Sequence, residues 1–437
     1  MKTKLLQGFV LFLSIYSISY AQERKTMSLT DAIALVITNS NDAILANTKV
    51  AASKLEMEIM KNNQYPSIKV SGQYMHLSGA NVNSHLGGSG SGLDVSQLLL
   101  GQANVALPIF SGFKIKNSIS ASENNYKAQS FTASHTKEEL ALDVVELFAS
   151  LYKSTEMVSL LKENFKSTQQ RTKDFSAMVD NGILARNDLL KVQLQESNVA
   201  LSLATAQKNV NVINYQLVSL LHLPENTSID IDIEAVKKDM ATNQMLTITA
   251  LRNDLEALNF QQKASDARIK VAKAGYYPSL ALTGGYIALD LKNTISVTNA
   301  MNLGVGFNYD LASIFKNGKE VKLAKIKSQE AKQAITQLSD KIKEETQQAQ
   351  ENYSLSLQQS KVYALASEQA IENYRIIKDK YDNSLANTND LLEADVMQLQ
   401  SKINLALSQA EIALKYYQLQ FASGKLINSF NLTTPTK

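Results

Sequence analysis

Two segments of more than sixty residues, 114–180 and 318–382, contain no proline and carry apolar or small residues at heptad spacing. The first seam consists of Leu140, Val144, Leu147, Leu151, Val158, Leu161 and Phe165, and the second of Val321, Ala324, Ser328, Ala331, Ile335, Leu338 and Ile342. A sustained repeat of 3.5 residues predicts α-helices that pack as coiled coils. At 1.5 Å per residue, each helix reaches about 100 Å. A globular enzyme has little use for such a length, whereas a fibrous coiled coil is an open alternative.

The chain repeats itself over a long interval. The segment "VDNGILARNDLLKVQLQ", which starts at Val179, aligns without gaps with "YDNSLANTNDLLEADVM", which starts at Tyr381. Asp188 falls on Asp390, a shift of 390 − 188 = 202 residues. A third heptad seam follows the second copy and consists of Val396, Leu399, Ile403, Ala406, Ala410, Ala413 and Tyr417. The period is far too long for a solenoid, so we expect one structural unit that has been duplicated.

Four shorter segments alternate apolar and polar residues with the period of two that is typical of β-strands. They predict strands at about 66–78, 101–110, 279–290 and 300–311. The alternating apolar positions are Ile68, Val70, Val105, Leu107, Leu280, Leu282, Leu303, Val305 and Phe307. Such alternation normally means that one face packs on a core and the other faces water.

A second interpretation is that these strands cross an outer membrane. Each has about ten residues, the length of a tilted transmembrane strand, and aromatic residues such as Tyr65, Tyr74, Phe110 and Tyr286 lie near the strand ends. The nine apolar positions then face lipid. Because four strands cannot close a barrel and lipid does not tolerate open strand edges, the chain is expected to oligomerise.

The first 25 residues have the pattern of a secretory signal. Lys2 and Lys4 precede an apolar stretch, and Ser19 and Ala21 are small, so we expect cleavage after Ala21. An N-terminal membrane anchor is the alternative. No later run approaches the roughly 18 apolar residues of a membrane helix. The absence of cysteine suits an oxidising compartment, and the net charge of +3 gives no sign of nucleic-acid binding.

These signals predict a mainly α fold with a membrane β-barrel portion, divided into five parts. The parts are a signal peptide, 1–21; a first repeat, 22–223, with helices 114–180 and 187–222; a connector, 224–251; a second repeat, 252–426, with helices 318–382 and 389–423; and a tail, 427–437.

Several motifs resemble those of the TolC family of outer-membrane efflux proteins. They are "LTDAIALVITNSNDAILA" at 29–46, the strand entries "YPSI" and "YPSL", "LPIFSGFK" after the second strand, and the two turns that lead into Asp-Leu-Leu. The resemblance covers nearly the whole mature chain. It implies a homotrimer with a twelve-stranded outer-membrane β-barrel, continued by a long periplasmic coiled-coil barrel of twelve helices. The connector then contributes to a belt around the tunnel.

The function that the resemblance implies is the exit duct of a tripartite efflux or type I secretion system. Such a duct works with a periplasmic adaptor (membrane fusion) protein and an inner-membrane pump of RND, ABC or MFS type. The adaptor docks at the two helical turns, here Gly182, Ile183, Leu184, Ser384, Leu385 and Ala386. Since the pump supplies the energy, no nucleotide site or other cofactor is expected.

The resemblance also implies an acidic gate. Asp390 and Glu393 lie three residues apart, on one helix face, and match the acids of the family's narrowest constriction; a solvated face without a role is the alternative reading. Asp188 and Tyr381 match further gate residues. The best-known members carry an arginine where this chain has alanine, at position 386, and Arg186 is a candidate substitute. Lys191 is expected to neutralise part of the Asp188 charge.

The sequence contains no set of residues with the spacing typical of an enzyme active site. The four histidines, His76, His85, His135 and His222, lack metal-ligand spacing and a nucleophile partner, so no catalytic residue and no metal site are expected. A Gly-rich run at 87–92 lacks the register of a phosphate-binding loop. A periplasmic adaptor or structural coiled coil, and a freestanding diffusion porin, remain as alternative functions.

Overall fold

The computed structural model describes residues 23–82, 93–232, 236, 252–292, 295–430 and 432. The expected signal peptide, the Gly-rich run at 87–92 with His85, most of the connector and most of the tail lie outside these residues. The helices are α2 (Leu29–Asn39), α3 (Asn41–Asn62), α4 (Lys114–Asp180), α5 (Arg186–Leu220), α7 (Asn253–Ala274), α8 (Ser313–Asp382), α9 (Thr388–Ala422) and α10 (Leu426–Ser429). The strands are β1 (Glu23–Met27), β2 (Ser67–Val82), β3 (Leu93–Phe110), β4 (Thr227–Ile231), β5 (Ser279–Leu291) and β6 (Ile295–Asn308).

The strand boundaries differ from the expected ones for identifiable reasons. β3 begins eight residues before the expected position, because Leu98 pairs with both Met75 of β2 and Leu291 of β5 although its neighbours do not alternate. β6 ends early, at Asn308, because Asp310 starts the turn that leads into α8 and its Oδ1 accepts the Ala312 N–H at 2.9 Å. In both places, long-range pairing or local capping outweighs the sequence period.

The described chain forms two compact units, each built from segments of both sequence halves. A helical unit contains residues 1–46, 134–253 and 340–437, and a sheet unit contains residues 47–133 and 254–339. The long helices α4 and α8 contribute residues to both units.

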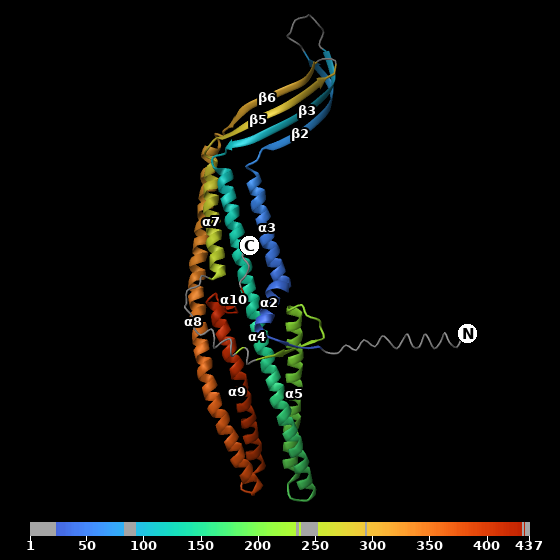
Figure 1. Ribbon diagram of the computed structural model, residues 1–437, viewed down its shortest axis with the longest axis vertical. Helices are drawn as coiled ribbons and strands as arrows, with labels where there is room; N and C mark the ends of the chain where they lie inside the picture. The colour runs from blue at the N-terminus through green and yellow to red at the C-terminus, as the bar shows by residue number, and fades with distance from the viewer. Residues whose placement is uncertain are drawn as a thin grey trace, which may run out of the picture. The chain divides into compact units, whose positions relative to one another are not determined.

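The sheet unit contains one antiparallel sheet with the strand order β2-β3-β5-β6, as Figure 1 shows. Directly opposed residues of an antiparallel pair lie on one face. The register pairs Ile68 with Val105, Leu107 with Leu282, Leu282 with Val305 and Leu280 with Phe307. All nine apolar positions therefore share one face of the sheet.

That apolar face is turned toward the exterior of the chain rather than toward a core. Val70 and Leu303 are each 81% exposed, and Phe307 is also exposed. The other face carries a row of opposed residues in which Lys69, Asn104 and Asn302 are polar and Gly285 has no side chain. The interpretation in which the apolar face packs on a core within one chain is therefore wrong.

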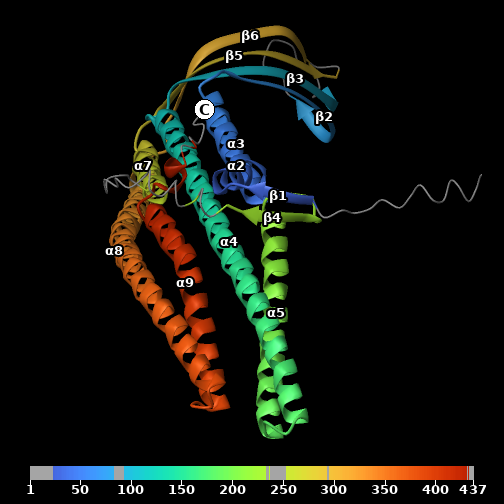
Figure 2. The ribbon, with the colours of Figure 1, turned by 60° about the horizontal axis from the view of Figure 1, so that its bottom comes forward.

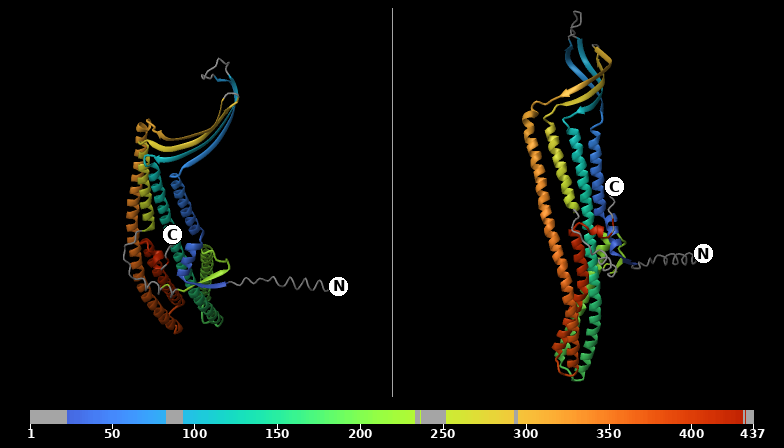
Figure 3. Two further views of the ribbon diagram at one scale, coloured as in Figure 1. Left: turned by 45° about the horizontal axis from the view of Figure 1, so that its top comes forward. Right: turned by 60° about the vertical axis from the view of Figure 1, so that its left-hand side comes forward.

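Each strand of the sheet continues into a helix. In the sheet unit, α3 and α7 precede β2 and β5, and the first parts of α4 and α8 follow β3 and β6 (Figure 3). Small buried residues, among them Ala121, Ala128, Ala264 and Ala267, let these helices approach closely. No helix in the described ranges is long and apolar enough to cross a membrane.

The helical unit is held by an apolar cluster that includes the first seam residues Leu140, Val144 and Leu151, together with Leu217 and Tyr417. Beside it, β1 and β4 form a parallel pair (Figure 2). The Asn214 side chain forms hydrogen bonds with backbone groups of β4. Its Nδ2 donates to the Thr227 carbonyl at 2.8 Å, and its Oδ1 accepts the Ile229 N–H at 2.9 Å.

A buried carboxyl group links α4 to the C-terminal segment of the same unit. The Glu138 Oε2 accepts the Ile427 N–H at 3.3 Å. Burial raises the pKa of Glu138 to about 7, although the N–H groups of Ile427 and Leu426 and the charge of Arg252 act in the opposite direction. The folded protein therefore keeps this proton to a much higher pH than the unfolded chain does.

The free energy of unfolding is expected to fall by about 2–3 kcal/mol as the pH rises from 5 to 8. The reason is that the folded state binds the extra proton between the ordinary pKa of 4.5 and the raised value of about 7. Glu138→Gln should remove most of this slope, whereas Glu163→Gln, at an exposed position of the same helix, should leave it. Denaturant unfolding at both pH values checks this, and equal slopes in the two variants would contradict it.

Candidate gate at the helical tips

The α4–α5 turn closes with a left-handed glycine. The Gly182 N–H donates to the Val179 carbonyl at 3.0 Å, and the Ile183 N–H donates to the Met178 carbonyl at 2.8 Å. Gly182 has φ of 71°. These two bonds satisfy the last carbonyls of α4, in the Schellman arrangement that ends many helices.

The α8–α9 turn has the same geometry at the positions shifted by 202. The Ser384 N–H donates to the Tyr381 carbonyl at 2.9 Å, and the Leu385 N–H donates to the Lys380 carbonyl at 2.7 Å. Ser384 has φ of 60°, a conformation that favours glycine. The sequence shift thus corresponds to a shared backbone geometry at the two tips.

Both turns present an apolar side chain to the exterior. Ile183 is 70% exposed and Leu385 is 78% exposed. Gly182 and Ser384 are also exposed, while Leu184 and Ala386 are half-buried. Single exposed apolar side chains are common on protein surfaces, so what distinguishes this pair is that it occupies equivalent positions of the two turns.

Asp390 lies in the first turn of α9 and completes a capping box. Its Oδ2 accepts the Asn387 N–H at 3.1 Å, while the Asn387 Oδ1 accepts the Asp390 N–H at 3.1 Å. A carboxylate at this position is also favoured by the helix dipole. Glu393, one turn further along α9, is exposed. The structure therefore gives Asp390 a capping role, which does not conflict with the expected gate role.

The matching acid of the first half is paired within its own helix. Asp188 accepts from Lys191 at 3.4 Å, as the sequence predicted. Arg186, the candidate substitute for the arginine missing at position 386, is exposed and makes no ion pair with any residue that the structure describes. In the single chain, Arg186 is thus not a partner of Asp188.

Tyr381 joins the two helical hairpins. Its ring stacks on that of Phe175 in α4, with centroids 5.9 Å apart and planes 5° apart. Burial raises the pKa of Tyr381, and the charges of Asp188 and Asp382 raise it further, whereas a hydrogen bond with Thr388 opposes the shift. The neutral tyrosine, which lies at the end of α8, therefore packs that helix against α4.

A buried polar node that the sequence analysis missed ties together four helices. The Arg171 Nη1 in α4 donates to the Asp395 Oδ2 in α9 at 3.0 Å, and its Nη2 donates to the Tyr374 hydroxyl in α8 at 3.3 Å. The Gln195 Nε2 in α5 donates to the same Asp395 oxygen at 2.9 Å. Burial alone lowers the pKa of Arg171, but Asp395 and Tyr374 outweigh it and raise the pKa.

The node also corrects one predicted seam position. Val396 was expected in the seam of α9 but is 54% exposed, whereas Asp395 is 3% exposed. The inward position goes to aspartate because Arg171 is buried opposite it. The sequence did hold a signal for this ion pair. Asp395 is adjacent to the expected seam residue Val396, and Arg171 lies between Thr168 and Phe175, which are both buried.

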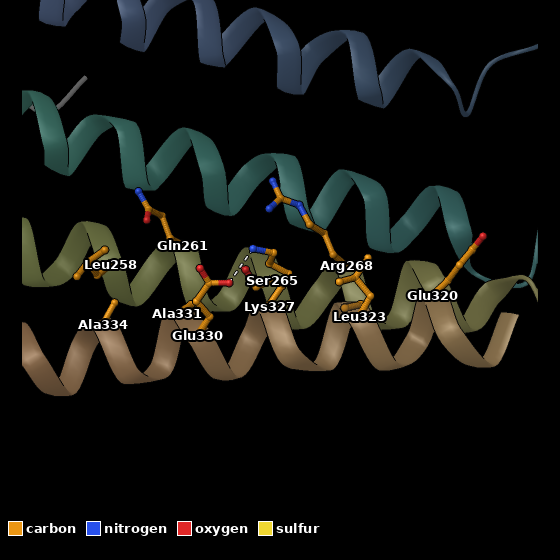
Figure 4. Close-up of a pocket in the computed structure, with 11 residues that line it drawn as sticks. Leu258, Gln261, Ser265, Arg268, Glu320, Leu323, Lys327, Glu330, Ala331 and Ala334 are labelled. Atoms are coloured by element: carbon orange, nitrogen blue, oxygen red, sulfur yellow. Dashed lines mark hydrogen bonds and ion pairs between the residues drawn. The ribbon is translucent and has the colours of Figure 1, made fainter.

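Grooves accompany these helices in both units. In the helical unit, a groove of about 540 Å³ between α4 and α8 is lined by Arg171, Phe175, Tyr374 and Tyr381, among others. In the sheet unit, a groove of about 500 Å³ lies between α7 and α8, where Lys327 and Glu330 form an ion pair at 2.7 Å (Figure 4). The described residues contain no cluster of three His, Cys, Asp or Glu side chains that could hold a metal.

An exposed apolar sheet face on strands that adjoin long coiled-coil helices is typical of outer-membrane channel proteins. The sequence model of the family described as "Outer membrane efflux protein" matches residues 33–221 and 247–425. The chain therefore belongs to the outer membrane efflux protein family. Its members are outer-membrane channels and not enzymes, so the resemblance to the TolC family is confirmed.

Solved channel structures share the fold. The outer-membrane channel OprN is 14% identical, with a TM-score of 0.76 over 91% of this chain and 89% of that chain. CmeC of Campylobacter jejuni is 18% identical, with a TM-score of 0.75 over 91% and 86%. VceC of Vibrio cholerae is 14% identical, with a TM-score of 0.75 over 92% and 95%. A search of curated protein sequences gave no significant match.

Proposed function

We propose that this protein is the trimeric exit duct of a tripartite efflux or type I secretion system. The observation that carries the proposal is the four-stranded sheet, which has one exposed apolar face and ends in the edge strands β2 and β6. In lipid, the polar groups of a strand edge need partners. Three copies that join β6 to β2 form a closed barrel of twelve strands, a size within the range of outer-membrane barrels.

The helices extend this proposal to a tunnel. Each half of the chain has the order helix, two strands, long helix, turn and helix, and the family model matches two separate stretches. These observations support a duplicated unit, with repeats at 22–223 and 252–426 and a connector between them. The signal peptide at 1–21 rests on the sequence pattern alone. In a trimer, the helices of three chains form one periplasmic coiled-coil barrel.

The tips supply the gate and the docking site. Threefold repetition of Asp390 and Glu393 places carboxylate rings at the narrow end, where such rings favour cations. The exposed side chains Ile183 and Leu385 provide apolar contacts for a periplasmic adaptor. An inner-membrane pump of RND, ABC or MFS type supplies the energy, so the duct opens only when the adaptor and pump dock.

Single-channel recording of the purified protein in a planar bilayer tests the proposal. We expect small, cation-selective currents that multivalent cations block from the side of the helical tips. Large, steady and unselective currents would instead identify a freestanding porin. Well-folded protein that never inserts would leave a periplasmic adaptor or structural coiled coil.

A further inference from the structure

The four strand–helix junctions of the sheet unit share one side-chain pattern. At each junction an aromatic residue lies in the connecting turn or, in the case of Phe315, in the first turn of the helix, and a lysine lies three or four positions further into the helix. The pairs are Tyr65 with Lys61, Phe113 with Lys116, Tyr277 with Lys273, and Phe315 with Lys319. Phe315 and Lys319 are four residues apart within α8 and therefore share one helix face. The other three aromatic residues lie just outside the ends of α3, α4 and α7, so each is close in sequence to the lysine in the adjoining helical turn.

The sheet register brings the four junctions to one edge. Ser67 at the start of β2 pairs with Ala106 of β3, and Leu280 of β5 pairs with Phe110 at the end of β3. Ser279 at the start of β5 pairs with Asn308 at the end of β6. The four pairs therefore form a band along the end of the sheet where the helices begin; we name these eight residues the junction band.

The side chains of the junction band are accessible. Phe315 is 87% exposed, and Tyr65, Phe113 and Tyr277 are exposed as well. Lys61 pairs with Glu123 at 3.4 Å. Lys116, Lys273 and Lys319 are exposed and have no ion pair with any residue in the described part of the chain. These cations are thus free to bind an external anion.

More lysines continue the pattern along two of the helices. Lys322 lies seven residues beyond Phe315, and Lys270 lies seven residues before Tyr277. Each of these two aromatic residues therefore has lysines four and seven positions away in the direction of the helix. The whole chain carries a net charge of only +3. Lysines in this arrangement form a local basic zone next to the exposed apolar face of the sheet.

We propose that the junction band binds the phosphodiester headgroups of anionic phospholipids in the leaflet at the helix end of the sheet. At a membrane boundary, an aromatic ring lies at headgroup depth, and a neighbouring lysine extends its ammonium group to the phosphates. Clustered lysines next to a membrane favour anionic over zwitterionic lipid. The inference rests on the proposed insertion of the sheet into a bilayer.

The test compares lipid binding by three variants of the full chain in nanodiscs of equal parts phosphatidylcholine and phosphatidylglycerol. The junction variant changes Lys61, Lys116, Lys273 and Lys319 to Gln, and a second variant changes the same four to Arg. A control variant changes four exposed lysines of the helical unit to Gln, namely Lys162, Lys173, Lys208 and Lys361. Mass spectrometry then gives the ratio of the two lipids retained by each protein.

We expect the junction variant to lose its preference for phosphatidylglycerol by at least about tenfold. The arginine variant and the control variant should retain it, because the first keeps the charge at the band and the second loses the same charge elsewhere. Added glycerol phosphate should not reduce the preference, since a soluble phosphate lacks the bilayer contact. Equal lipid ratios in the junction and control variants would overturn the inference.

Resistance to extraction from vesicles at alkaline pH separates this inference from the proposed function. If wild-type protein inserts but shows no preference for phosphatidylglycerol, only the lipid inference fails. If wild-type protein does not insert at all, the proposed function is contradicted, and the lipid inference loses its basis with it.

Discussion

Arg171→Met is expected to destabilise the helical unit by about 3–5 kcal/mol and to raise the conductance of the channel at rest. Methionine fills much of the arginine volume but cannot pair with Asp395, whose side chain is 4% exposed. A buried charge that loses its partner bears the full cost of desolvation. Because Arg171 and Asp395 connect the α4–α5 hairpin to the α8–α9 hairpin, their separation should let the two tips move apart.

A double variant distinguishes the ion pair from a simple packing defect. Arg171→Met combined with Asp395→Leu removes both charges and should recover most of the lost free energy of unfolding. Arg375→Met serves as the matched control: it removes an exposed arginine that pairs with Glu372 and Asp379, and exposed ion pairs contribute little to stability. Denaturant unfolding and bilayer recording give the two measurements. If Arg171→Met and Arg375→Met cost the same, the node has no special role.

Asp390→Asn together with Glu393→Gln is expected to bring the cation-to-anion permeability ratio close to one. The same double variant should weaken the block by multivalent cations by about tenfold or more, because rings of carboxylates concentrate cations at a narrow opening. Asparagine is the sharper substitution at position 390, since its side-chain oxygen can still accept the Asn387 N–H that Asp390 accepts. The variant thus removes charge while the helix cap is kept.

The control for this experiment is the double variant Glu163→Gln with Glu368→Gln. Both acids are exposed on α4 and α8 and lie away from the tips along their helices. Loss of the same charge there should leave selectivity and block nearly unchanged. If wild-type selectivity survives in the Asp390 and Glu393 variant, these two acids do not form the constriction.

Much of the fold could be predicted because its patterns are local. The long helix at 114–180 has the expected bounds, and the seam of α8 through Val321, Ile335 and Ile342 is less exposed than its flanks. The period of two also predicted which residues share the apolar face of the sheet. Strand ends were less accurate, since Leu98 is held by partners on both neighbouring strands rather than by its own sequence context.

The candidate gate was predictable only in part. The repeat drew attention to Asp188 and Asp390, and the Asp188–Lys191 pair lies within one helix turn, so that spacing alone predicted it. The capping bonds between Asp390 and Asn387 are equally local, but the repeat and the family resemblance did not predict them. The resemblance to a family suggested a role for Tyr381, but its stacking partner Phe175 is distant in sequence and could not be found from spacing.

By itself, the amino-acid sequence determined the long helices, the alternating strands and the two equivalent turns, because each depends on residues a few positions apart. Only the tertiary structure decided that Arg171 and Asp395, separated by 224 positions, share one buried node with Tyr374 and Gln195. A heptad pattern specifies which side of a helix is buried, but it does not specify which charge on another helix lies opposite. That pairing depends on how the hairpins pack against each other, and packing is a property of the assembled helices.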